Sequence, residues 1–374
     1  MSGAILTRPQ SQVTRLGARS ADAALVSIYL VAFFALWFLL PLLTGKDVPG
    51  DNFEQLNWAL APALGYAKHP PFPTWVLWLF ERVFPANVPL TYALGALEVA
   101  GLLTLVWRIG CLILDRRRAL LAVLCVSCVS YYSFRMHFYN HNTALLVASA
   151  ASLPVLWRCV ESNAIRWWAL LGLVWGIGML CKYQMAVTIA CNGAFLMTEG
   201  RARLREQSKG IFVAAIVAGF VVLPHIVWLV QNDFPTFTYA SKSLAANAPW
   251  PARPGREVKF LADQLLRLAN LIPVLLALAW VARGRSAESA PASAQARRFL
   301  AIHAFGPLVI MTLLSMCFGV DLQMHWGTAF LWAVPLWLAA TPWGARIAAL
   351  DARVILACVS GAQVLMAAGF SLRL

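Results

Sequence analysis

Charge is what this sequence has least of. Only 12% of its 374 residues are charged, whereas 60% are apolar and the mean hydropathy is +0.69. A soluble protein needs about 25% charged residues to cover its surface. The shortage excludes a set of soluble domains and predicts that most of the outer surface faces lipid. Acidic residues are scarcer than basic ones, since 16 Asp and Glu stand against 30 Lys and Arg, which leaves a net charge of +14.

Other absences narrow the class further. The sequence shows no internal repeat, no Cys/His spacing typical of structural zinc, and no soluble segment of domain size. Cys125-x-x-Cys128 lies in an apolar segment, where small packing residues are the simpler interpretation. The basic head has no cleavage site after a short apolar core, so residues 1–22 are expected to form a cytoplasmic tail rather than a removed signal peptide.

Long apolar runs are what the sequence does have. A helix needs about 20 apolar residues to cross a bilayer. The long candidates are Ala23–Gly45, Met136–Trp157, Gly210–Asn232, Phe299–Val320, Leu322–Ala345 and Val354–Leu372, and the shorter or interrupted ones are Val88–Leu114, Ala119–Phe134, Trp167–Cys181, Tyr183–Thr198 and Leu268–Ala282. The sequence therefore predicts an all-α, polytopic integral membrane protein with about 11 transmembrane helices, in one domain over residues 23–372 and with no separate soluble C-terminal domain.

The basic residues indicate an orientation. With the N-terminus in the cytoplasm, every inward segment is short and basic, and together these segments hold eighteen of the 30 Lys and Arg. We therefore expect an inner (plasma) membrane protein with a cytoplasmic N-terminus and an outward C-terminus. Because the excess is spread over small loops and forms no continuous face, a nucleic-acid partner is not indicated.

Two long outward loops are expected, over residues 46–87 and 233–267. The first contains two aromatic-rich stretches that predict helices lying in the membrane interface. Asp51 precedes the first of these stretches, where it is either a reactive carboxylate or an ordinary helix N-cap. Lys182 separates two apolar segments too short to span the bilayer fully, so its turn is expected to be recessed below the outer surface. A lysine at that depth either faces an anion or snorkels to the interface.

Two more polar groups lie on the same side. Arg135, His141 and Asn142 lie where two predicted spans meet, and His325 lies near the start of another. We expect these residues to line one cavity with Asp51 and Lys182. A carboxylate there can act as general base for an acceptor hydroxyl, and Lys or Arg can stabilise a phosphate leaving group. The recessed Lys182 is at a suitable depth for the phosphate of a lipid-linked sugar donor.

The motifs carry a family resemblance. Asp51-Asn52-x-Glu54 followed by Lys68-His69-Pro70-Pro71 resembles the GT-C superfamily of polyprenyl-phosphate-dependent glycosyltransferases. The nearer branch is the protein O-mannosyltransferase-like one (family 39, PMT_2), which includes aminoarabinose and galacturonosyl lipid A transferases. The stretches Tyr139–Leu146, Gly176–Tyr183 and His325-Trp326 are also similar to that branch, so that the likeness covers residues 23–340.

The resemblance implies a membrane glycosyltransferase that moves a sugar from a polyprenyl-phosphate donor to an extracytoplasmic lipid, glycan or protein acceptor, as in cell-envelope or lipopolysaccharide modification. It implies a catalytic role for Asp51 and donor-phosphate contacts for Lys182 and His69. From the residues themselves we expect Glu54 to orient Asp51 or the acceptor, and Lys68 and Arg256 to contact the donor phosphate, with attraction to anionic lipid headgroups as the alternative for Arg256. The residues expected to line the cavity or meet the acceptor are Tyr183, His141, Asn142, Arg135 and His325. Many relatives carry an aspartate where this chain has Asn142, and a glutamate where it has Lys68. No metal site is therefore assigned, although a divalent metal stays open.

A transporter and a non-catalytic scaffold are the two alternatives to an enzyme. A transporter or flippase of a lipid-linked envelope precursor would share the spans and the membrane-level charges. Such proteins usually have repeated halves and broken helices at mid-membrane, whereas here the polar positions gather on one side. A non-catalytic scaffold would not need Asp51 and Lys182 at these depths. We therefore expect an enzyme, with the transporter as the alternative.

Overall fold

The computed structural model describes residues 10–45, 48–244, 250–286 and 291–372. All regular structure in these ranges is helical. The helices are α1 Gln10–Thr44, α2 Gly50–Ala59, α3 Phe72–Phe80, α4 Val88–Ile113, α5 Arg116–Ser127, α6 Ser130–Phe134, α7 His141–Ser162, α8 Ile165–Cys181, α9 Met185–Thr198, α10 Arg201–Gln231, α11 Pro235–Leu244, the 3₁₀ turn η1 Trp250–Ala252, α12 Arg253–Arg267, α13 Leu271–Val281, α14 Ala294–Phe318, the 3₁₀ turn η2 Trp326–Ala329, α15 Ala333–Ala340, α16 Pro342–Ala348 and α17 Ala352–Ser371. The predicted all-α class is confirmed.

Six helices in the described ranges are long and apolar enough to cross a membrane, namely α4, α7, α10, α14, α17 and the part of α1 from Ala23 to Thr44. α12 and α13 qualify as one further span if the bent pair, which turns by 56°, is taken together. α8 and α9 are shorter apolar helices. The protein is therefore a multi-pass membrane protein, and the count of about 11 crossings stays a prediction that depends on the shorter helices.

Two predicted spans are not single helices. Residues 322–345 are divided among η2, α15 and the start of α16. Pro342 opens α16, and Thr341 before it has an extended backbone, since a residue that precedes proline is disfavoured in a helix. The segment 119–134 breaks after Ser127 into α5 and α6. An apolar run without charge permits a helix but does not require a continuous one. The predicted tail also differs, because α1 already begins at Gln10, while residues 1–9 lie outside the described ranges.

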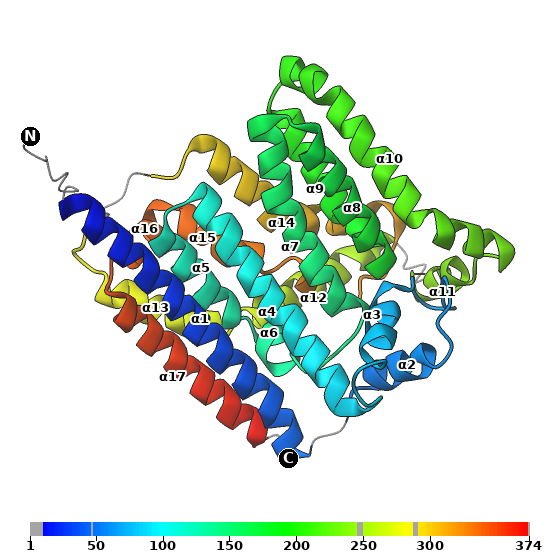
Figure 1. Cartoon of the computed structure of the whole chain (residues 1–374), viewed down its shortest axis with the longest axis horizontal. Helices are drawn as coiled ribbons and strands as arrows, with labels where there is room; N and C mark the ends of the chain where they lie inside the picture. The colour runs from blue at the N-terminus through cyan, green and yellow to red at the C-terminus, as the bar shows by residue number, and fades with distance from the viewer. Residues whose placement is uncertain (1–9, 46–47, 245–249, 287–290, 373–374) are drawn as a thin grey trace, which may run out of the picture.

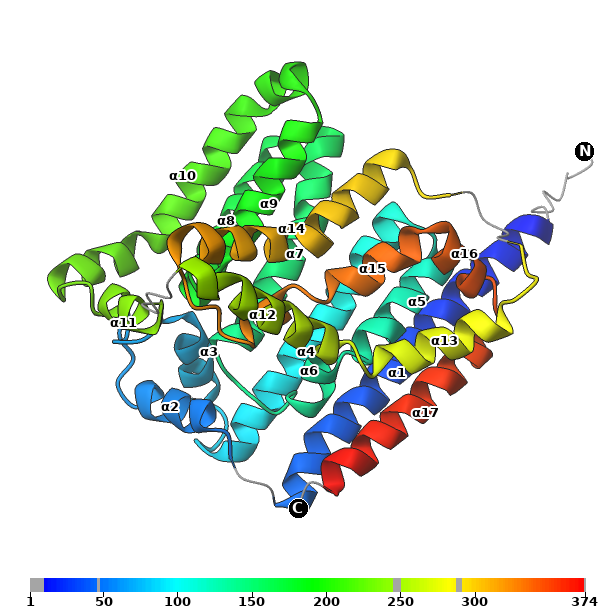
Figure 2. The same ribbon diagram turned by 180° about the vertical axis from the view of Figure 1, so that it is seen from behind.

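The helices differ in how much of their apolar surface other helices cover. In the most apolar window of α7, 78% of the residues are buried, whereas the figure for α10 is 17%. α7 packs against α4, α8 and α9 and is the central helix, while α10 packs against α8 at one side of the bundle (Figure 1). α1 and α17 run side by side at the other edge, as both views show (Figures 1 and 2). Exposed Phe220, Trp280 and Phe318 fit an outer surface that faces lipid.

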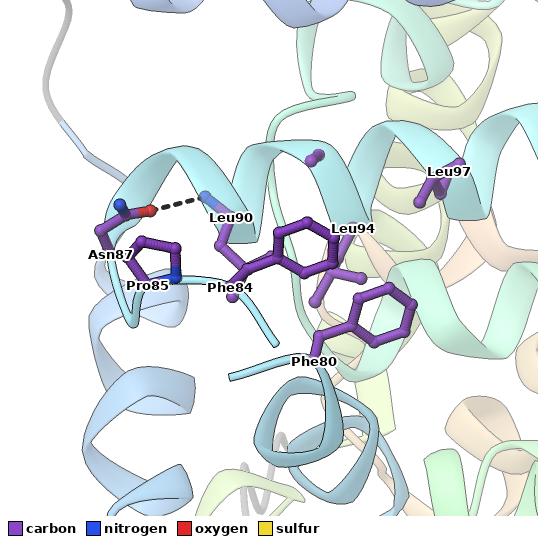
Figure 3. Close-up of a pocket in the computed structure, with 8 residues that line it drawn as sticks. Phe80, Phe84, Pro85, Asn87, Leu90, Leu94 and Leu97 are labelled. Carbon is purple, nitrogen blue, oxygen red and sulfur yellow. Dashed lines mark hydrogen bonds between the residues drawn. The ribbon is translucent and has the colours of Figure 1, made fainter. Parts of the chain in front are cut away.

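The two expected helices of the first outward loop are present as α2 and α3. They gather with α11 at one corner of the molecule (Figures 1 and 2). A groove of about 290 Å³ opens between Phe80 and Phe84, at and beyond the end of α3, and Leu90 and Leu94 on one face of α4 (Figure 3). The Asn87 side chain begins α4 beside it, accepting a hydrogen bond from the Leu90 amide at 3.0 Å. None of the predicted site residues lines this groove.

Candidate active site

Two residues at the start of α7 bring the two central candidates together. Asn140 Nδ2 donates to Asp51 Oδ2 at 2.7 Å, and Lys182 Nζ donates to Asn142 Oδ1 at 2.6 Å. Asp51 is on α2 and Lys182 lies between α8 and α9, so residues 131 positions apart are held at one helix N-terminus. Lys182 Nζ also lies over the Trp326 ring, 5.5 Å from its centroid, which places the segment after His325 in the same group.

Asn140 is fixed by its role as helix cap. Its Oδ1 accepts from the backbone N–H groups of Asn142 at 2.8 Å and Thr143 at 3.1 Å. In return, Thr143 Oγ1 accepts from the backbone N–H of Asn140 at 3.0 Å. This reciprocal arrangement is a capping box with Thr at its third position. Because the oxygen is used by the helix, the amide nitrogen must face Asp51. The sequence contains a signal for Asn140, because it is an N-cap residue type before an apolar run. That signal predicts a helix start and does not by itself indicate a site residue.

Asp51 is exposed in the first turn of α2. The N-cap of that helix is Pro49, and no side chain caps it. The alternative in which Asp51 is an ordinary cap is therefore not what the structure shows. A carboxylate near a helix N-terminus is stabilised by the helix dipole, and here both α2 and α7 begin beside it.

The rest of α2 is anchored by buried amides. Asn52 is fully buried, donates to Thr91 Oγ1 at 2.8 Å and to the His137 carbonyl at 2.9 Å, and accepts from the Tyr139 amide at 3.1 Å. The segment it holds lies directly on α4, since a Cβ at Gly95 would come within 2.6 Å of the Met136 and Phe138 carbonyl oxygens. Asn52 thus fixes the position of its neighbour Asp51 relative to Asn140.

A stack of rings forms one side of the site. His69 lies against His141, with ring centroids 4.2 Å apart, and Trp58 meets His141 edge-on at 5.8 Å. His141 is buried and placed by its two nitrogens. Nε2 is 3.0 Å from the Pro70 carbonyl, and Nδ1 is 3.4 Å from Nε2 of Gln55. The carbonyl requires a donor, so the Nε2–H tautomer fits, with Nδ1 accepting from the Gln55 amide.

The protonation of the site follows from burial and from its neighbours. Burial lowers the pKa of Lys182, in the turn between α8 and α9, to about 8, and Asp51 opposes that shift. Burial, with Lys182 and Lys68 nearby, lowers the pKa of His69 to about 3. The pKa of His325 falls to about 4 through burial and through Lys182, Arg267 and Arg135. Near pH 7 both histidines are neutral, so they can donate or accept a hydrogen bond but carry no charge.

Four further predicted residues have partners of their own. Glu54 pairs with Lys68, which raises the pKa of that lysine. The side chain that contacts Asp51 is thus Asn140, while Glu54 contacts Lys68. Arg256 lies 3.5 Å from Asp321, and both are exposed. Arg135 is exposed at the end of α6, with its guanidinium over the Phe138 ring at 5.0 Å.

Tyr183 connects the site to α10 and α11. Its hydroxyl lies 2.7 Å from His225 Nε2 and 3.2 Å from Thr236 Oγ1, and His225 Nδ1 lies 2.7 Å from the Leu64 carbonyl. Tyr239, also on α11, faces His69, with centroids 6.1 Å apart. Neither His225 nor Tyr239 was expected from the sequence, because nothing local to the chain shows that residues 225–239 return to residues 64–69.

In the described part of the chain, no three His, Cys, Asp or Glu side chains lie close enough together to hold a metal ion. The divalent metal that the sequence left open therefore has no ligand set of that kind among these residues. The cations and amides around Asp51 instead suit anionic oxygen groups.

Comparison with known proteins identifies the relatives. Residues 68–228 match the family described as dolichyl-phosphate-mannose-protein mannosyltransferase. The lipopolysaccharide core galacturonosyltransferases RgtA and RgtB of Rhizobium johnstonii are 27% and 23% identical, each over 84% of this chain. The chain spans 63% and 65% of the length of these two relatives.

The fold also has solved counterparts. The crystal structure of ArnT from Cupriavidus metallidurans bound to undecaprenyl phosphate has a TM-score of 0.65 and 16% identity, over 91% of this chain and 62% of that one. The apo structure of the same protein gives a TM-score of 0.66 over 92% of this chain and 62% of that one. The resemblance predicted from the sequence motifs is thereby confirmed, since the chain is similar over most of its length to named glycosyltransferases and has the fold of ArnT.

Proposed function

We propose that the chain is a membrane glycosyltransferase that moves a sugar from a polyprenyl-phosphate donor to an extracytoplasmic acceptor in the cell envelope. The observation that carries this proposal is the placement of a carboxylate, Asp51, and an ammonium, Lys182, on two amides of one helix N-terminus. The ArnT neighbour was solved with undecaprenyl phosphate, and the RgtA and RgtB relatives are named for transfer to lipopolysaccharide core.

The proposed chemistry uses the two charges separately. The Asp51 carboxylate takes the proton of the acceptor hydroxyl as its oxygen attacks the anomeric carbon of the donor. The bond from that carbon to the phosphate oxygen breaks on the opposite face, which inverts the anomeric centre. The departing phosphate keeps the electron pair and is stabilised by Lys182, while His69, neutral near pH 7, donates a hydrogen bond to it. The acceptor proton ends on Asp51, and the polyprenyl phosphate is released.

The remaining predicted residues take outer positions. Arg256 and Lys68 are proposed to contact the donor phosphate once it displaces their present partners, Asp321 and Glu54. Glu54 would then be free to meet the acceptor. The residues proposed for the acceptor or the sugar are Tyr183, His141, Asn142, Arg135 and His325.

We further propose a uronic acid as the sugar. RgtA and RgtB are named as galacturonosyltransferases. In this chain three cations near His325 lower its pKa together, namely Lys182, Arg267 and Arg135. A sugar carboxylate would be attracted to such a cluster, whereas a cationic amino sugar would be repelled.

The proposed topology places the candidate site relative to the membrane. About 11 crossings, with α8 and α9 as short spans joined at Lys182, would put α2, α3, α11 and the candidate site on the periplasmic side of the inner membrane. The basic helix starts at residues 116–118, 201–209 and 297–298 would then lie in the cytoplasm. In this proposal the chain before residue 23 also lies in the cytoplasm, and residues 46–87 and 233–267 face outward.

The test is transfer by the purified protein in proteoliposomes, with a panel of radiolabelled polyprenyl-phosphate sugars and lipopolysaccharide as acceptor. We expect transfer by the wild type from a uronic acid donor and none by Asp51→Asn. Absence of transfer from every donor would refute the proposal, and full activity of Asp51→Asn would refute the role of Asp51. Movement of the labelled lipid across the bilayer without transfer would support the transporter alternative.

A further inference from the structure

The starting observation is that Asp51 and Lys182 lie at one helix N-terminus without forming an ion pair. Asp51 is near enough to Lys182 to favour the ammonium and so to oppose the fall in the pKa of that lysine. Yet among the ion pairs of the described residues, none within 4.0 Å joins them. Two opposite charges in partly buried surroundings attract strongly, so something must hold them apart.

The two amides of α7 do so with opposite polarity. Asn140 presents its nitrogen, a donor, to the carboxylate, and Asn142 presents its oxygen, an acceptor, to the ammonium. The polarity of Asn140 is not free to change, because its oxygen is bound by two helix amides. Both partners are neutral, so each charge is oriented without being cancelled. A carboxylate at position 142 would bind Lys182 more tightly but would neutralise it.

We propose that Asn140 and Asn142 are positioning residues that keep the Asp51 carboxylate and the Lys182 ammonium apart, so that each charge stays available to a substrate. The catalytic consequence rests on the proposed function. The separation itself does not, because it is a property of the protein without substrate. The other titratable groups that face this pair are His69, His141, His325, Lys68 and Tyr131, and they are unchanged in the variants below.

The first experiment needs no transfer reaction. The full-length protein in nanodiscs is treated with an amine-acylating reagent from pH 6 to pH 10, and the modification of Lys182 is followed by mass spectrometry. Asn142→Asp should raise the midpoint of Lys182 labelling by about one pH unit or more, since a carboxylate favours the ammonium form. Asn142→Leu, which removes the acceptor without adding charge, should lower the midpoint. Identical midpoints in the wild type and both variants would overturn the role of Asn142.

The same labelling tests Asn140. In Asn140→Ser the serine still caps α7, but the donor to Asp51 is lost. The carboxylate is then free to approach Lys182, and the labelling midpoint should rise. Asn140→Asp also keeps the cap and places a second negative charge beside the pair, so it should raise the midpoint further. Thermal unfolding midpoints of the two variants equal to that of the wild type would show that the cap is intact. A labelling midpoint unchanged from the wild type in both variants would overturn the role of Asn140.

Transfer kinetics then test the catalytic consequence. Asn140→Ser should lower kcat by about 10- to 100-fold, the usual effect of losing a hydrogen bond to a charged group. It should also move the acid limb of the pH profile downward, because the carboxylate exchanges a neutral donor for the Lys182 ammonium, which favours its charged form. Loss of rate without movement of the acid limb would mean that Asn140 is only structural. Absence of transfer by the wild type would refute the proposed function but leave the labelling result standing.

Discussion

Two clusters of polar side chains in this apolar chain are built in opposite ways. One joins α1, α5 and α17, where buried Gln363 accepts a hydrogen bond from Trp37 at 2.9 Å and donates to the Ser127 carbonyl at 3.0 Å, with the Tyr29 hydroxyl beside it. The other is the candidate site, where Asp51 and Lys182 are each held by one neutral amide. In the first cluster the groups satisfy one another, whereas in the second two charges are left uncancelled.

The difference distinguishes polar groups that join helices from polar groups that we propose do chemistry. In lipid, a hydrogen-bonded side-chain network links helices and has little tendency to exchange partners. A charge kept apart from its opposite costs free energy and is retained only where a substrate uses it. Variants in the two clusters should therefore fail in different ways, and the following predictions are ordered from the largest effect to the smallest.

Asp51→Asn should have the largest effect on transfer. The variant keeps the shape of the side chain but removes the base, so kcat should fall by about 10²- to 10⁴-fold. Because Asp51 is exposed, the thermal unfolding midpoint should stay close to that of the wild type. Transfer assays in proteoliposomes and a thermal melt measure the two properties. A large fall in the melting temperature with transfer activity retained would mean that Asp51 is structural, like the residues of the first cluster.

Lys182 should show opposite effects on activity and stability as pH rises. Its pKa in the folded protein is about 8, below the ordinary 10.5, so the unfolded chain binds more protons between these values. Stability should therefore increase from pH 8 to pH 10.5, while kcat/KM for the donor should fall above pH 8 as the ammonium is lost. Lys182→Met should abolish the pH-dependent gain in stability and lower kcat/KM about 100-fold. A flat profile of kcat/KM through pH 8 would contradict a role for the ammonium.

Gln363→Leu should destabilise without affecting chemistry. The change leaves the buried Trp37 Nε1 without its acceptor, at a cost of about 1–3 kcal/mol, and removes the donor that Gln363 gives to the Tyr29 and Ser127 hydroxyls, which keep their bond to each other. The melting temperature should fall, and kcat/KM below that temperature should be unchanged. Gln363→Glu is a useful comparison, since an added charge in the same place should be worse. A selective loss of transfer by Gln363→Leu at full stability would erase the distinction between the clusters.

Arg256→Ala should have the smallest effect. Arg256 and Asp321 are both exposed, and an exposed ion pair contributes about 0–1 kcal/mol. We expect an unchanged melting temperature and a rise of a few fold in KM for the donor, with kcat unaffected. Asp321→Asn, which leaves the cation without its partner, should lower KM instead. Changes in the same direction for both variants would argue against a phosphate contact at Arg256.

The sequence predicted more of the fold than of the site. The long helices follow from apolar runs that a bilayer requires to be about 20 residues long, and the charges between them set their limits. The continuous span over residues 322–345 failed because local breaks at Pro342 and before η2 are not visible to a count of apolar residues. In the site, Asp51 and Lys182 were found because charges are rare in this chain. Asn140 and Gln55 were missed because neutral amides are not rare enough to draw notice.

What the sequence by itself determined is the class of protein and which of its few charged residues lie between the apolar runs, because transfer of apolar surface into lipid depends on composition and order alone. What only the tertiary structure decided is which charges are not paired with an opposite charge. Glu54 and Lys68 were also candidates in the sequence, yet they pair with each other, while Asp51 and Lys182 are each held by a neutral side-chain amide at the start of α7. That choice depends on where a helix from the middle of the chain begins, and no local pattern around residue 51 or residue 182 contains it.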